Sequence, residues 1–288
     1  MTTPRPAVIV RRMTATDIPF ADEVRACARW NQTPRDWQGY LSFEPEGCFV
    51  AEAAGRPAGT AMAIGYEGRI GWIGMVLVHP DFRRMGIGTA LLQAALHFLR
   101  ARGIATIKLD ATPMGKPVYV PLGFRDEYEV TRYEGVTPAG VALPADVTAL
   151  TATDCAELSA LDARALGAAR PAVLADLSRR NPDLCFVLRE GSHLAGGLIA
   201  REGASALQLG PWVARDAGTA ARLLQAFFHR APGRRVFLDL PDPNVAGREL
   251  LLRYGFTVQR TFTRMFLGEN THPGDPTLVF GTSGAEKG

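Results

Sequence analysis

The stretch of the 288-residue chain with the clearest chemical meaning is Arg83 to Thr89, which reads RRMGIGT. It stands between an apolar run over residues 70–78, which predicts a buried strand, and apolar residues at helical spacing over 90–99. The glycines therefore open the predicted helix, where backbone N–H groups lack a partner within the helix and attract anions. Arg83 and Arg84 add positive charge. Charge-assisted hydrogen bonds of roughly 1.5–3 kcal/mol outweigh a helix dipole of ~0.3–1 kcal/mol, so we expect this loop to bind a pyrophosphate.

Two known glycine-rich loops fit this stretch poorly. A P-loop needs Lys and then Ser or Thr after its second glycine, whereas Gly88 is followed by Thr89 and Ala90. A dinucleotide-binding loop needs a third glycine, where this chain has Leu91, although Asp110 stands about 20 residues further on, as that motif requires. A nucleotide-binding protein therefore stays open only as a weaker alternative.

The residues around the loop predict an ordered series of elements. Thr33 and Pro34 begin a second helix after one that starts at Asp17, and strands follow over 48–53, 59–65 and 70–78. After the loop and its helix come a strand over 104–110, a short helix over 117–122 and a strand from Phe124. Helices first, and then a mixed sheet with helices on its faces, predict an α/β fold.

The chain repeats itself. Leu91 to Ala94 recurs as Leu223 to Ala226, and the same shift of 132 carries Gly123–Phe124 to Gly255–Phe256 and Thr131–Arg132 to Thr263–Arg264. Earlier in the chain the shift is 137, as between Cys48 and Cys185, so the second copy lacks five residues. A duplication places two domains, 1–138 and 139–288, around a Gly- and Pro-containing boundary.

Composition narrows the class of protein. A net charge of +3 with 21% charged residues is too small an excess to indicate a nucleic-acid surface. The sequence has neither an apolar run of membrane-spanning length nor the pattern of a signal peptide at its start, so we expect a cytoplasmic protein without a membrane partner. The four cysteines have no metal-binding spacing, and we expect no metal and four reduced core thiols.

With its strand of Val76, Leu77 and Val78, the motif Arg83-x-x-Gly86-x-Gly88 resembles the acyl-CoA loop of the GNAT superfamily of N-acetyltransferases. The order of elements is similar to the GNAT fold over nearly all of both copies. The resemblance implies two tandem GNAT domains, each a mixed, mostly antiparallel twisted sheet flanked by helices. It also implies acetyl-CoA as co-substrate, with the strand backbone pairing with pantetheine. The implied cofactor-binding residues are Val76, Leu77, Val78, Arg83, Arg84, Met85, Gly86, Ile87, Gly88 and Thr89.

The same resemblance suggests where the chemistry lies. Tyr119, five residues before Phe124, matches the family's general acid, whose hydroxyl protonates the leaving thiolate. Asp110 is the best candidate to bind or deprotonate the amine, although a polar cap at the end of its strand is an equal alternative. Acceptor recognition is expected from the loop between the first two helices. Its candidate substrate-binding residues are Trp30, Asn31, Gln32 and Trp37, although both tryptophan rings could equally pack in the core.

The second copy keeps a loop-like pattern, Arg215-x-x-Gly218-x-Ala220, but the shift of 132 replaces Tyr119 by Leu251. The same shift turns the strand 76–78 into 208–210. We therefore expect a degenerate second domain and direct acetyl transfer to a small-molecule or peptide amine in the first. The alternative is a non-catalytic acyl-CoA-binding or sensing protein. For the tail from Glu269 we expect one edge strand over 277–280 and mobility elsewhere.

Overall fold

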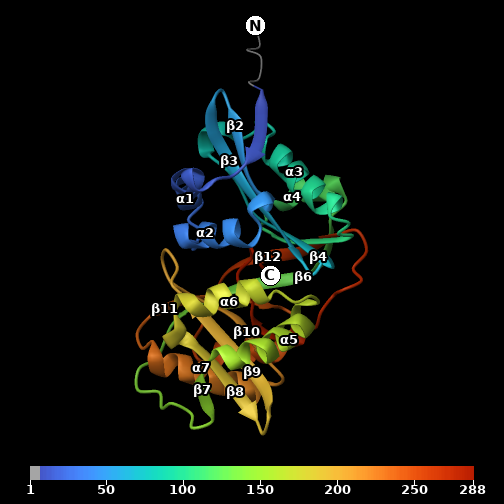
Figure 1. Ribbon diagram of the computed structural model, residues 1–288. Helices are drawn as coiled ribbons and strands as arrows, with labels where there is room; N and C mark the ends of the chain where they lie inside the picture. The colour runs from blue at the N-terminus through green and yellow to red at the C-terminus, as the bar shows by residue number, and fades with distance from the viewer. Residues whose placement is uncertain (1–6) are drawn as a thin grey trace.

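The computed structural model describes residues 7–288, which form two similar halves (Figure 1). In the first half, the helices are α1 (Ile18–Cys27), α2 (Pro34–Phe43), α3 (Ile87–Ala101) and α4 (Lys116–Tyr119). Its strands are β1 (Val8–Arg12), β2 (Cys48–Ala53), β3 (Arg56–Tyr66), β4 (Ile70–Val78), β5 (Thr106–Ala111) and β6 (Arg125–Val136).

The second half repeats this order of elements. Its helices are α5 (Cys155–Leu166), α6 (Pro171–Arg180), α7 (Ala217–Arg230) and α8 (Val245–Arg253). Its strands are β7 (Val147–Ala149), β8 (Cys185–Glu190), β9 (His193–Arg201), β10 (Leu207–Ala214), β11 (Arg235–Pro241), β12 (Thr257–Leu267) and β13 (Val279–Gly281).

The duplication predicted from the sequence is visible in how the helices begin. Thr14 and Asp17 form a capping box before α1, in which the carboxylate accepts from the threonine N–H. Thr151 and Asp154 form the same box before α5. Equivalent local hydrogen bonds at equivalent places show that the two copies share a folding pattern as well as a sequence pattern.

The strands form one sheet that runs through both halves, in the order β1-β2-β3-β4-β5-β12-β6-β11-β10-β9-β8-β7. The last strand of each copy has moved beside the fifth strand of the other, so β12 pairs with β5 and β6 pairs with β11. Both exchanged strands cross the middle of the molecule in Figure 1. Local sequence patterns did not predict this exchange, because either strand satisfies the same hydrophobic pattern in either place.

Helices cover the sheet and join the halves. Helix α3 packs with β2 to β5 in one core cluster, while α1 and α2 share another cluster with α5 and α6. The shared cluster means that the halves meet through apolar core and not only through polar surface. Within residues 7–288, none of the helices is long and apolar enough to cross a membrane.

The expectation of a mobile tail is wrong. Strand β13 pairs with β10, and Thr282 donates its N–H to the Asp239 carbonyl oxygen of β11. Beyond it, the side chains of Glu286 and Lys287 are buried and contact Gln32 and Asp36 of the first half. The tail therefore fills the gap between β10 and β11 and then extends to the junction of the halves.

Candidate functional site

The site begins where β4 and β5 separate. The two strands pair in parallel only over Ile70–Trp72 and Thr106–Lys108. A bulge follows at Met75, which has a φ of 54°, and the register of β4 against β3 shifts there. Within residues 7–288, no strand pairs with the β5 side of β4 beyond Trp72. Backbone groups at the end of β4 are therefore available to an extended ligand that lies like an added strand.

The glycine loop opens α3 as the sequence predicts. Gly86 is the N-cap residue and has a φ of 82°, a left-handed conformation that favours glycine, and within residues 7–288 no side chain caps this end of the helix. A Cβ added at Gly88 would have Val78 as its nearest neighbour at 3.6 Å, so packing within the protein leaves that position free. The bare first turn of α3 can therefore donate N–H groups to a phosphate that approaches closely.

Exposed cations stand beside this helix end. Arg83 and Arg84 are both exposed, and neither has an acceptor or an ion-pair partner among the described residues. Arginine provides several N–H donors in a planar fork that matches phosphate oxygens. The loop thus combines uncapped N–H groups with two free guanidinium groups.

A cleft of about 1100 Å³ connects the loop with the separated strands. It is lined by Val76, Leu77, Val78, Arg83, Arg84, Gly86, Ile87, Gly88 and Thr89, nine of the ten residues proposed to bind the cofactor. The tenth, Met85, packs instead against the apolar cluster of α3. These residues fit a long ligand with an anionic group and an extended arm. The first turn of α3 and the two arginines can bind the anionic group, and the free edge of β4 can bind the arm.

Tyr119 lines the cleft and also a smaller cavity that shares several lining residues with it. Its ring packs on Phe124, with 5.9 Å between the ring centroids. Burial raises the pKa of the Tyr119 hydroxyl to about 12, so the phenol stays protonated near neutral pH. Its position and protonation state are both suitable for a proton donor.

The smaller cavity has a volume of about 80 Å³ and is built by both halves. Sequence reasoning missed several lining residues, namely Arg132, Arg260, Phe262, Ala285 and Glu286. The exchange of β6 and β12 brings Arg260 and Phe262 into the site, and the packing of the tail brings Ala285 and Glu286. The recurrence of Thr131–Arg132 as Thr263–Arg264 was the one sequence signal that pointed to these strands.

Asp110 lines the smaller cavity but is held in an ion pair. Arg264 of β12 donates from Nε to Oδ1 at 2.8 Å and from Nη2 to Oδ2 at 2.9 Å, and its guanidinium stacks 4.7 Å from the Trp72 ring. Burial raises the pKa of Asp110, against the opposing effect of Arg264. Because both oxygens already accept from an arginine, the geometry favours a structural role over the predicted role as base.

The four candidate acceptor residues separate into two groups. Trp30 and Gln32 line the smaller cavity, and their role in acceptor binding stays a prediction. Asn31 instead bonds to the second half, where its Nδ2 donates to the Ala206 carbonyl oxygen at 3.0 Å. Trp37 is fully buried and packs edge-on against Tyr40. Asn31 and Trp37 are therefore corrected to a junction residue and a core residue.

A buried charge network holds the tail against this cavity. Arg201 of β9 donates to Glu286 at 2.9 Å and to Asp36 of α2 at 3.2 Å, and Gln32 donates to the other Glu286 oxygen at 2.7 Å. Lys287 pairs with both carboxylates. Burial, with the adjacent Arg201, lowers the pKa of Lys287 to about 8. The network fixes Glu286 at the cavity wall with both oxygens occupied.

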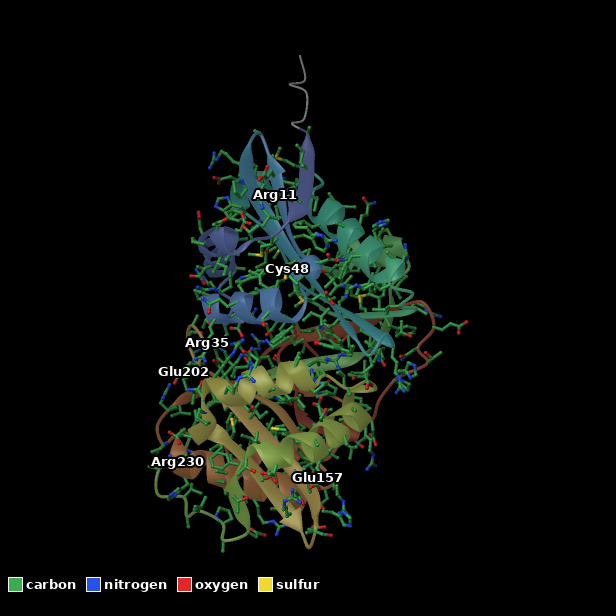
Figure 2. All side chains as sticks on the ribbon, in the orientation of Figure 1. Arg11, Arg35, Cys48, Glu157, Glu202 and Arg230 are labelled. Atoms are coloured by element: carbon green, nitrogen blue, oxygen red, sulfur yellow. The ribbon has the colours of Figure 1, made fainter. Side chains whose placement is uncertain are left out.

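Two of the four cysteines are not core thiols. Cys48 and Cys185 are buried, but Cys27 is exposed and lines the large cleft, and Cys155 is partly exposed. Burial raises the pKa of the Cys48 thiol to about 12, and Figure 2 shows this residue inside the first half. Cys48 is therefore unsuited to act as a nucleophile, because the thiolate is the reactive form.

Comparison with known proteins matches both halves to the same superfamily. Residues 17–124 match the Acetyltransferase (GNAT) family, and residues 158–281 match an Acetyltransferase (GNAT) domain. Among curated proteins, the chain is 25% identical over 252 residues to holothin acyltransferase of a Pseudoalteromonas species, covering 87% of this chain and 84% of the relative. It is also 25% identical over 193 residues to the uncharacterized N-acetyltransferase YitH of Bacillus subtilis, covering 66% of this chain and 67% of that protein.

Solved structures share the fold. A protein from Pyrococcus horikoshii, provisionally described as an acetyltransferase, superposes with a TM-score of 0.84 at 24% identity, covering 98% of this chain and 96% of its own. A tandem GNAT protein from the clavulanic acid biosynthesis pathway superposes with a TM-score of 0.64 at 16% identity, covering 91% and 98%. These likenesses support a two-domain acetyltransferase fold throughout the chain.

Proposed function

Since the chain belongs to the GNAT superfamily of acetyltransferases, with two GNAT domains in tandem, we propose that it transfers an acetyl group from acetyl-CoA to an amine. The proposed site is the cleft of the first half. The observation that carries the proposal is the pairing of an uncapped, arginine-flanked helix end with separated strands β4 and β5, because acyl-CoA is anionic at one end and extended at the other. The relatives named above are an acyltransferase and an N-acetyltransferase, which supports this choice.

The roles of the residues follow from their places. The loop from Arg83 to Thr89 would hold the pyrophosphate, and the edge of β4 would hold the pantetheine arm and polarise the thioester carbonyl through an N–H group. Acetyl-CoA supplies the activated acetyl group. Tyr119 would donate a proton to the leaving sulfur.

The amine is proposed to attack the thioester directly. Cys48 is buried, and the carboxylates lining the smaller cavity, Asp110 and Glu286, have both oxygens engaged in the described part of the chain. We therefore propose that the amine loses its proton to water.

A thiol-release assay across small amines and short peptides tests this function. We expect acetyl-CoA to release thiol in the presence of an acceptor and the Gly86→Glu variant to release none, because the new side chain brings negative charge to the phosphate site. Binding of acetyl-CoA without release for any amine would instead support the non-catalytic acyl-CoA-binding alternative.

Cys27 provides a readout that needs no acceptor. It is exposed at the rim of the large cleft, whereas Cys155 of the second half is partly exposed and outside both described cavities. We expect acetyl-CoA to protect Cys27 from alkylation and to leave Cys155 unchanged, as measured by mass spectrometry. Protection by ATP or NAD and none by acetyl-CoA would favour a nucleotide-binding protein.

A further inference from the structure

Arg260 is a cation in the acceptor region that has no carboxylate partner in the described part of the chain. It belongs to β12 of the second half but lines both the large cleft and the smaller cavity. Among the described residues, its guanidinium has one acceptor, the Gln259 side-chain oxygen at 3.1 Å from Nε. Its remaining N–H groups are therefore free to bind a ligand.

The other charged side chains that line the smaller cavity are paired. Asp110 pairs with Arg264, Arg132 pairs with Asp239 at 2.6 Å, and Glu286 pairs with Arg201 at 2.9 Å. Arg260 is left as the positive charge in excess. A buried or half-buried charge without a partner is costly, so an anionic ligand would stabilise this site.

A second cation on the neighbouring strand β6 adds to the positive charge around Arg260. The register of β6 and β12 places Arg132 directly opposite Arg260, and these two cations disfavour one another. Burial, followed by the charge of Arg132, lowers the pKa of Arg260. Burial and Arg132 both disfavour the charged form of Arg260, whereas a ligand carboxylate beside it would favour that form.

The equivalent position in the other copy shows that a cation is not required by the fold. The shift of 132 relates Arg260 to Tyr128, which lies opposite Arg264 in the same strand pair. There the hydroxyl of Tyr128 accepts from Arg264 Nη1 at 3.0 Å, so that position is neutral and satisfied. Arg260 therefore departs from the internal repeat, and this departure leaves guanidinium N–H groups without an acceptor among the described residues.

The position of Arg260 favours the acceptor over the phosphates of acetyl-CoA. The cleft and the smaller cavity share Tyr119, Trp30 and Val76 as lining residues, whereas the loop residues from Arg83 to Thr89, apart from Met85, line only the cleft. Arg260 is thus at the end where the thioester and amine would meet. We propose that Arg260 binds a carboxylate of the acceptor, so that the substrates are small amines that also carry a carboxylate, such as amino acids. This inference rests on the proposed acetyl transfer.

Matched acceptors test the inference. Thiol release is measured for a panel of amino acids, each beside its amide, with the native chain, Arg260→Gln, Arg260→Lys and the control Arg253→Gln. Arg253 is an exposed residue of α8 outside both cavities. We expect the native chain to prefer acids over amides and Arg260→Gln to raise KM for the acids ~10- to 100-fold, because a charge-assisted bidentate pair is lost.

The controls separate the inference from the proposed function. KM for acetyl-CoA and activity toward the amides should stay unchanged in Arg260→Gln, Arg260→Lys should recover part of the preference, and Arg253→Gln should match the native chain. A raised KM for acetyl-CoA alone, or no preference for acids in the native chain, would overturn the inference while leaving acetyl transfer intact.

A binding measurement covers the case in which no amine is acetylated, which would contradict the proposed function. Calorimetry with N-acetylated amino acids and their amides then asks whether the carboxylate binds at all. We expect binding of the acids by the native chain and its loss in Arg260→Gln. Equal binding by both proteins, or none by either, would count against the carboxylate site itself.

Discussion

The two halves of the chain have the same fold but treat the slot between their fourth and fifth strands in opposite ways. In the first half, β4 and β5 separate and leave an open cleft. In the second half, β10 and β11 separate in the same manner after Gln208 and Phe237, but β13 lies between them. A segment of the protein thus occupies the place in which we propose that pantetheine binds in the first half.

The two halves also differ in the connection that leads into α3 or α7, where we propose that the first half binds the phosphates. Eight residues, 79–86, connect β4 to α3, whereas only Arg215 and Asp216 connect β10 to α7. Asp216 caps α7 by accepting from the Thr219 N–H at 2.8 Å, so a carboxylate occupies the site that Gly86 leaves free in the first half. A shorter loop, one capping side chain and one inserted strand thus remove from the second GNAT domain the features that form the proposed ligand site of the first, while the architecture is kept.

This comparison corrects the sequence interpretation of the second loop. Gly218 and Ala220 lie inside α7 and do not form a loop. The shift of 132 also fails for the strand, because Val78 pairs with Gly59 as Ala214 pairs with Gly196. Strand residues 76–78 therefore correspond to 212–214 and not to 208–210.

The largest expected effect separates the two loops. Gly86→Glu should weaken acetyl-CoA binding at least ~1000-fold, since it strains a left-handed position and places a negative charge beside the phosphates. Gly218→Glu should leave affinity unchanged, because that residue lies in a helix away from the proposed site. Calorimetry should give one acetyl-CoA per chain, and a second site sensitive to Gly218→Glu would contradict the difference between the halves.

A matched pair of carboxylates tests whether the halves share a scaffold. Asp110 with Arg264 and Asp239 with Arg132 are equivalent buried ion pairs. Asp110→Asn and Asp239→Asn should each lower the free energy of unfolding by about 3 kcal/mol, because each leaves a buried guanidinium uncompensated. Denaturant titration measures this loss. If Asp110→Asn alone abolished the acid limb of the kcat profile at unchanged stability, Asp110 would be the general base after all.

The tyrosine has no equivalent in the second half, where Leu251 stands in its place. Tyr119→Phe should lower kcat roughly 30- to 100-fold with little change in KM for acetyl-CoA, because general acid catalysis acts on the chemical step. With its pKa raised to about 12, Tyr119 should cause no alkaline loss of activity below about pH 10. Tyr254→Phe, on the second half, is the control. Steady-state kinetics with unaltered kcat in Tyr119→Phe would remove this residue from the mechanism.

The smallest effect concerns the tail that distinguishes the second half. The pKa of Lys287 is lowered to about 8 by burial and Arg201, while the unfolded chain has the ordinary lysine value. Between these two values the unfolded state binds more protons, so the free energy of unfolding should rise with pH, by roughly 1.5 kcal/mol from pH 8 to 9.5. Denaturant titrations should show less of this rise in Lys287→Met. An equal slope in both proteins would mean that Lys287 titrates normally.

Local features of the fold could be predicted from the sequence. The strand Ile70–Val78 has the predicted bounds, and Thr33 caps α2 as the Thr-Pro pair indicates. The glycine loop and Tyr119 could be picked out as candidate site residues because each is recognised from its neighbours in the chain, and both line the cleft. The GNAT resemblance and the fold class are confirmed by the comparisons.

Non-local features could not be predicted. Trp37 and Asn31 have the composition of a binding loop, but the first fills the core and the second binds the other half. The tail from Glu269 is rich in Gly and polar residues and was therefore expected to be mobile. Its order comes from partners such as Arg201 and Asp36, which are far away in sequence. Likewise, nothing near Arg260 in the sequence indicates that β12 reaches the first half.

The exchange of β6 and β12 has a consequence for the history and engineering of the molecule. A fragment cut at the sequence boundary would leave β5 without β12 and β11 without β6, each exposing an unpaired strand edge. The halves should therefore fold and unfold as one cooperative unit. Removing the second copy would also remove β12 from the sheet of the first half, so any shortened form of the protein that keeps the first half must keep β12 as well.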